Sequence, residues 1–131
     1  MISDWIAIQT YINSRSKGKA SKSLEKVIAL NGEAAYLYAL KVLNGRFQKG
    51  EKSIALNPEI SVKYARFVLR SRFKEAEKLI SFNPELCYQY FKHVVRERLP
   101  EKMHVSMLVM SFKFPGNYFI AKYMKEVGVL S

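Results

Sequence analysis

The residues with the clearest chemical use in this 131-residue chain are basic side chains at helical spacing. Lys63, Arg66 and Arg70 lie at steps of three and four residues, so a helix places them on one face. Lys92 and Arg96 lie 26 residues after Arg66 and Arg70, and stacked helices join the two sets into one surface. A contiguous row of cations suits the regularly spaced phosphates of a nucleic-acid backbone.

A second row of lysines follows a set of shorter predicted helices: Lys22, Lys26, Lys52, Lys74 and Lys78. Both rows belong to a chain with 22 Lys and Arg against 11 Asp and Glu, a formal net charge of +11 that favours polyanionic or acidic partners. The competing interpretation is a solvated charged face, because lysine-rich surfaces are common. At the positions of Lys63, Arg66 and Arg70 the first unit has Leu37, Leu40 and Asn44, so the scaffold itself does not require charge there.

Residues suited to catalysis or metal binding are sparse. His93 and His104 are the two histidines, and a histidine pair with lysine can cleave RNA by acid and base steps, but two unrelated surface histidines are the commoner case. Cys87 lies near the start of an apolar helix and is expected to be buried. Asp4 is the single aspartate. The sequence therefore predicts a non-enzymatic protein with no catalytic residues, no metal and no cofactor.

An internal repeat organises the chain. Three segments, 25–33, 51–59 and 77–85, match almost letter for letter at a period of 26 residues, and the register persists downstream in Tyr38, Tyr64 and Tyr90. A fixed period of this size is typical of stacked supersecondary units, none of which can bury its apolar face alone.

Each unit is predicted to be a helical hairpin. The Asn-Pro-Glu sequences at 57–59 and 83–85 predict the start of a longer helix, and a shorter one is expected over 22–30, 48–56 and 74–82. Gly45 and Gly50 are expected to supply backbone freedom at the reversal between helices. Because no segment alternates polar and apolar residues, the predicted class is all-α, a short α-solenoid with degenerate terminal caps.

We predict a single domain over 1–131 that contains three 26-residue repeats at 25–99. Residues 1–24 form an N-terminal cap helix and a basic linker, the helix being formed by Trp5, Ile6, Ile8, Tyr11 and Ile12. Residues 100–131 form a divergent C-terminal cap hairpin, with a Met-rich helix over 102–112. Tyr123 follows Tyr90 by 33 residues, which predicts an insertion before the last hairpin.

Arginine and glutamate also recur with the repeat, as Arg46, Arg72 and Arg98 and as Glu51 and Glu77. A guanidinium matches a carboxylate with two parallel hydrogen bonds. We therefore expect internal ion pairs that fix the hairpin turn, rather than a functional site.

Residues 35–51 and 64–77 resemble the short helical repeats found in many small proteins of tailed bacteriophages. In those repeats a Tyr-Ala helix is followed by Gly-Arg-aromatic, two variable residues, Ala or Gly, then Glu and an Asn/Asp-Pro pair. The resemblance covers 25–99, although Ser71 and Glu97 replace the glycine and Phe91 replaces the alanine. It implies a phage origin, action in the bacterial host cytoplasm, and a scaffold rather than an enzyme.

The sequence thus predicts a binding protein whose basic face engages DNA or RNA backbone, or a host complex loaded with nucleic acid. The predicted partner-binding residues are Lys63, Arg66, Arg70, Lys92, Arg96, Lys74, Lys78 and Lys52. The alternative is a protein that docks on an acidic surface of a restriction, CRISPR or transcription component and inhibits it, with Met103, Met107 and Met110 as an adaptable apolar surface. No membrane segment or signal peptide is indicated, so a cytoplasmic protein is expected, with its oligomeric state left open.

Overall fold

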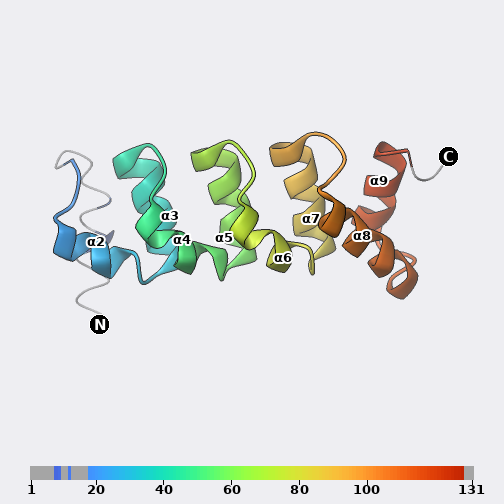
Figure 1. Ribbon diagram of the computed structural model, residues 1–131, viewed down its shortest axis with the longest axis horizontal. Helices are drawn as coiled ribbons and strands as arrows, with labels where there is room; N and C mark the ends of the chain where they lie inside the picture. The colour runs from blue at the N-terminus through green and yellow to red at the C-terminus, as the bar shows by residue number, and fades with distance from the viewer. Residues whose placement is uncertain (1–7, 10–11, 13–17, 129–131) are drawn as a thin grey trace.

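A computed structural model describes residues 8, 9, 12 and 18–128 of the chain, and every statement below concerns these residues. They form helices and turns without any strand, which confirms the all-α class. The longer helices stand side by side in one row, and the shorter helices cross near their lower ends (Figure 1). Neighbouring units pack on each other, so the core runs the length of the row.

The helices alternate between two sets, which we call short and long after their lengths in the first three units, although α8 is longer than α9. The short ones are α2 (Lys22–Ile28), α4 (Gln48–Ala55), η3 (Lys74–Ala76) continuing into α6 (Glu77–Ile80), and α8 (Glu101–Lys113). The long ones are α3 (Gly32–Tyr38) with η1 (Ala39–Leu43), α5 (Pro58–Lys63) with η2 (Tyr64–Leu69), α7 (Pro84–Tyr90) with η4 (Phe91–Val95), and α9 (Tyr118–Glu126).

Each long helix begins after an asparagine. The side-chain oxygens of Asn31, Asn57 and Asn83 accept the backbone N–H three residues later, at 2.9, 3.0 and 3.1 Å, and so satisfy a helix-terminal donor. Asn117 does the same for α9. The predicted Asn-Pro-Glu starts are confirmed, whereas the short helices end one or two residues earlier than predicted because the chain turns toward these caps.

The first three long helices end in a π-helical turn followed by a left-handed residue. These residues are Asn44, Arg70 and Arg96, with φ of 53°, 54° and 62°. Backbone hydrogen bonds from Gly45 N to Ala39 O (3.1 Å) and from Ser71 N to Ala65 O (3.2 Å) close the first two ends. The reversals that follow lie along the upper edge of the row (Figure 1).

The two glycines expected at the first reversal have other roles. Asn44, rather than Gly45, takes the left-handed conformation. Gly50 is buried inside α4, where a Cβ atom would lie 2.6 Å from the Ala35 Cβ and 2.7 Å from the Phe47 ring. Gly50 therefore allows α3 and α4 to approach closely, and the prediction of backbone freedom there was wrong.

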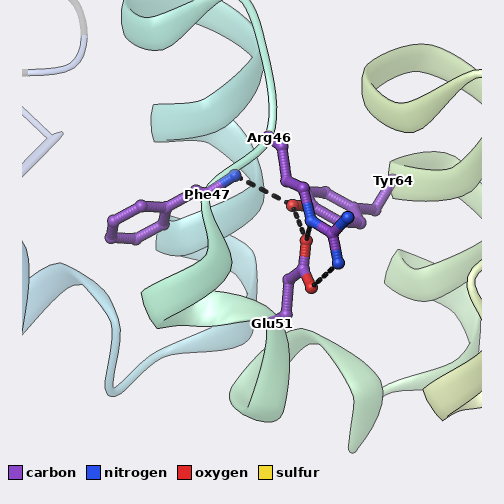
Figure 2. A network of polar contacts seen from close by, with 4 residues as sticks. All are labelled: Arg46, Phe47, Glu51 and Tyr64. Carbon is purple, nitrogen blue, oxygen red and sulfur yellow. Dashed lines mark hydrogen bonds and ion pairs between the residues drawn. The ribbon is translucent and has the colours of Figure 1, made fainter.

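A buried tyrosine ties each reversal to the next long helix (Figure 2). The Tyr64 hydroxyl accepts the Phe47 N–H at 2.9 Å and donates to Glu51 Oε2 at 2.7 Å. The Arg46 guanidinium donates two hydrogen bonds to the same carboxylate, at 2.7 and 2.9 Å. We call this set of a tyrosine, a backbone N–H and an acceptor the tyrosine clasp.

The clasp recurs at both neighbouring units. Tyr90 accepts from Phe73 N at 2.8 Å and donates to Glu77 at 2.6 Å, and Arg72 pairs with that carboxylate at 2.8 Å. Tyr38 accepts from the backbone N–H of residue 20 at 2.9 Å and donates to Glu25 at 2.7 Å. Burial alone raises the pKa of Glu77, but the hydrogen bonds from its arginine and tyrosine outweigh burial and hold that pKa below its ordinary value.

The last clasp uses a different acceptor. Tyr123 accepts from Leu99 N at 3.2 Å, and its hydroxyl lies 2.6 Å from His104 Nδ1. The direction of the hydrogen bond between the hydroxyl and Nδ1 depends on the tautomer of His104. A histidine thus takes the place of the glutamate.

The C-terminal hairpin absorbs the predicted insertion by lengthening its short helix. α8 has 13 residues, against 8 in α4. Met103, Met107 and Met110 are buried against the core, at 2%, 0% and 8% exposure. They form an adaptable surface only if exposed, so their burial weakens the version of the inhibitor hypothesis that uses them.

The N-terminal helix predicted from apolar spacing is described only in part. Ile8 and Ile12 are buried in the core at 4% and 0% exposure. Trp5, Ile6, Tyr11 and the linker segment 14–17 lie outside the described residues.

Replacing Tyr64 by phenylalanine should lower the free energy of unfolding by about 2 kcal/mol, because the buried Phe47 N–H and the Glu51 carboxylate both lose a partner. Tyr36→Phe is the matched control, since Tyr36 is 7% exposed but its hydroxyl has no hydrogen-bond partner among the described residues. Its effect should stay within about 0.5 kcal/mol. Urea denaturation measures both, and equal losses for the two variants would contradict the role given to the clasp.

Candidate polyanion-binding edge

The C-terminal ends of three long helices form the upper edge of the row. η1 packs against η2, and η2 packs against η4. The tyrosine clasps hold the chain just after each end, and the short helices lie toward the opposite edge (Figure 1). The position of the upper edge is therefore set by repeat geometry rather than by its own surface side chains.

A groove of about 510 Å³ lies between η2 and η4 on this edge. Arg66, Phe67 and Arg70 line one side, and His93 and Arg96, with Val94, line the other. We call it the arginine groove. Three arginines thus line one concave surface, which is a suitable arrangement for an anion with several oxygens.

The charges of this groove are not neutralised within the described part of the chain. No carboxylate oxygen there lies within 4 Å of Arg66, Arg70 or Arg96. Burial lowers the pKa of His93, and the positive charges of Arg66, Lys92 and Arg96 lower it further. The groove is therefore a local excess of positive charge with a neutral histidine in its wall.

The five-residue stripe predicted from helical spacing is divided by the structure. Arg66, Arg70 and Arg96 line the groove, whereas Lys63 is exposed on the preceding turn and does not line it. Lys92 pairs with Glu126 of α9 at 3.2 Å. Its partner lies outside the 26-residue register, so the repeat alone could not have shown this neutralisation.

The predicted short-helix lysines lie elsewhere. Lys52 is exposed on α4, and Lys74 and Lys78 line a separate cavity of about 570 Å³ beside Arg72 and Glu77. These residues belong to the lower half of the row, away from the arginine groove (Figure 1).

The repeat-periodic arginines take part in different contacts from those of the groove. Arg46 and Arg72 are held by Glu51 and Glu77 in the clasps. Arg98 lies 3.9 Å from Glu101, and Met103 stands five residues after it, where Arg46 and Arg72 have Glu51 and Glu77. These arginines therefore contribute to the scaffold rather than to the arginine groove.

Sequence reasoning missed Phe67 and His93 as lining residues. They are repeat equivalents, 26 residues apart, and each directly follows a basic residue. That shared position was the signal that could have placed them at the groove.

Two of the groove arginines occupy strained backbone. Left-handed conformation disfavours side chains with a Cβ atom by about 1 kcal/mol or more, and asparagine tolerates it best after glycine. The first unit has Asn44 at this position, whereas the second and third have Arg70 and Arg96. A residue kept where its backbone is unfavourable points to a use for its side chain.

The two histidines have different surroundings. His104 is 3% exposed and held by Tyr123, so the expectation of a surface histidine was wrong for it. Cys87 is fully buried as predicted, and burial raises the pKa of its thiol to about 12. Among the described residues, no three His, Cys, Asp or Glu side chains gather closely enough to hold a metal ion.

Comparison of the chain with protein-family models, curated proteins and solved structures finds no match. The resemblance to phage repeats therefore stays a prediction, and the site is argued from its own geometry. Within residues 18–128 and the few described before them, no helix has the length and apolar character needed to cross a bilayer.

Replacing Arg70 and Arg96 by asparagine should raise the free energy of unfolding by about 0.5 to 1 kcal/mol at each site, because asparagine relieves the left-handed strain. Arg66→Asn is the control, since Arg66 lies inside η2 at ordinary backbone angles and its replacement should lower stability by a few tenths of a kcal/mol. Urea midpoints measure the difference. A loss of stability at Arg70 and Arg96 would show that these side chains stabilise the fold.

Acid should weaken the last clasp before the others. Burial lowers the pKa of His104, with a further contribution from Arg98, so the unfolded chain takes up a proton first, near pH 6.5. The contribution of neutral His104 to the free energy of unfolding is then fully present above about pH 6.5 and is lost as the pH drops below it. His104→Asn keeps an acceptor near Nδ1 without titrating, so its melting temperature should change less between pH 7.5 and 5.5. His93→Asn is the control, and it should retain the part of the pH dependence that comes from His104.

Proposed function

We propose that this protein is a non-enzymatic binding protein that holds a nucleic-acid backbone along its upper edge, free or within a host nucleoprotein complex. The observation that carries the proposal is the arginine groove, which three arginines line without a carboxylate within 4 Å among the described residues. The left-handed backbone of Arg70 and Arg96 supports it, because arginine is strained in that conformation.

The arginine side chain suits phosphate better than a lysine ammonium group, which acts as a point charge. Its planar guanidinium donates two parallel hydrogen bonds to phosphate oxygens, and it is weakly hydrated, so it loses little when it leaves water. Contacts of this kind fix the position of a backbone and supply affinity by releasing counterions, without reading sequence. We therefore propose binding with a steep salt dependence and little base preference.

The test compares two triple variants that remove the same number of positive charges. The first variant removes the positive charges of the arginine groove by Arg66→Gln, Arg70→Gln and Arg96→Gln. The second removes charges from the short helices by Lys52→Gln, Lys74→Gln and Lys78→Gln. Fluorescence anisotropy with a labelled random-sequence 20-mer, over a series of salt concentrations, gives the affinity and its salt slope. The arginine variant should reduce the slope by about 2, since each lost phosphate contact removes about 0.7 to 0.9.

The lysine variant should keep most of the affinity, with a smaller change in slope. Circular dichroism and urea denaturation of both variants check that the fold is retained. Equal losses in the two triples would mean that overall charge, rather than the arginine groove, holds the polymer. No binding by the unmodified protein at 20 mM salt would reject the proposal.

A second candidate function, docking on an acidic protein surface of a host factor, is favoured by the lower edge. The four turns from a short to a long helix lie along this edge (Figure 1). Each carries one exposed apolar residue, namely Leu30 (81%), Leu56 (75%), Phe82 (64%) and Phe114 (54%). An exposed lysine lies one helical turn before each of the first three: Lys26, Lys52 and Lys78.

Repeated lysine and apolar side chains fit a partner with acidic residues around small apolar depressions. This candidate predicts no oligonucleotide binding by the unmodified protein. In a binding assay with an acidic protein partner, the lysine triple would lose the partner and the arginine triple would keep it. The two candidates use opposite edges of the row, so they are separable by these variants.

A further inference from the structure

We propose that the polymer held on the upper edge is single-stranded, with one unpaired base seated in a second groove beside the arginine groove. This inference rests on the proposed function and names its substrate class. It comes from the chemical difference between two adjacent grooves and from the residues that they share.

The second groove lies between η1 and η2 and has a volume of about 390 Å³. Ala39, Leu40, Asn44, Gly45 and Val68 line it together with Phe67 and Arg70. We call it the η1–η2 groove. Its volume falls within the range of about 300 to 1,000 Å³ that small-molecule sites occupy.

Phe67 and Arg70 line both grooves and so form the wall between them. The Phe67 side chain is 46% exposed, and the Arg66 guanidinium carbon lies 4.8 Å from its ring centroid. An exposed ring next to a guanidinium is a surface on which a base can stack, since every base has a π-face and arginine adds a cation–π contribution. Arg70 in the same wall can hold the phosphate attached to that base.

The two grooves differ because the first unit lacks charge. Leu40 and Asn44 stand at the positions that Arg66 and Arg70 occupy in the second unit. The η1–η2 groove is lined by one arginine and the arginine groove by three, so the first is suited to the base and the second to the phosphates that follow it. Asn44 has an amide that can donate to and accept from a base edge.

A duplex can use only half of this arrangement. Its bases are stacked and paired, and moving one out of the stack costs a few kcal/mol. Duplex contact is then limited to phosphates on the arginine groove, although its charge density is higher. A single strand offers unpaired bases at no such cost, so it should bind more tightly than duplex of the same sequence.

The experiment measures the affinity of the full chain by anisotropy for three probes: a single-stranded 20-mer of DNA, the duplex of that sequence, and a 20-mer with abasic sites in place of bases. We expect single-stranded DNA to bind about tenfold more tightly than the abasic probe, the contribution of one stacked base. Phe67→Leu should remove this advantage and leave the salt slope unchanged. Phe112→Leu, at 86% exposure on α8, is the control and should change nothing.

The abasic probe keeps the test informative even if a variant folds poorly, because it removes the bases from the unmodified complex. Equal affinity for single-stranded and abasic probes, or tighter binding of duplex, overturns the single-strand inference. In that case continued sensitivity to the arginine triple would still support the proposed function. Loss of binding to all three probes at low salt overturns both.

Discussion

The structure depends on the need of a buried tyrosine hydroxyl for both a donor and an acceptor. In each unit the donor is the backbone N–H of the returning chain and the acceptor is a side chain of the short helix. Burying the hydroxyl without either partner would be costly, so the two contacts form together or not at all. One hydroxyl thereby fixes the reversal after one long helix to the start of the next unit, and this sets the upper edge.

The clasps also determine which charged side chains have partners within the fold. They occupy the periodic glutamates Glu25, Glu51 and Glu77 with tyrosine and basic partners. The arginine groove, between η2 and η4, is left without a carboxylate within 4 Å among the described residues. The clasps thus pair the buried carboxylates, and a like-charged cluster with two left-handed residues lies next to the chain segments that they hold.

Much of the fold could be predicted from the sequence because it follows from local rules. The 26-residue period, the Asn-Pro-Glu caps and the lack of alternation indicated helices close to those observed. The contacts that depend on tertiary geometry could not. The left-handed Arg70 and Arg96 follow from the π-helical turns, and the Lys92 contact with Glu126 crosses from the third unit to the out-of-register α9. His104 takes its role from position rather than residue type, and Met103 is buried because the lengthened α8 packs on α9.

The central claim is that the arginine groove, and not the basic surface at large, receives the polymer. It is tested most directly by following the side-chain Nε–H signals of the arginines by ¹⁵N NMR during titration with a single-stranded oligonucleotide. The signals of Arg66, Arg70 and Arg96 should shift, while those of Arg46 and Arg72, held by Glu51 and Glu77, should stay in place. Equal shifts across all of these arginines, or shifts confined to backbone amides of the lower edge, would contradict the account.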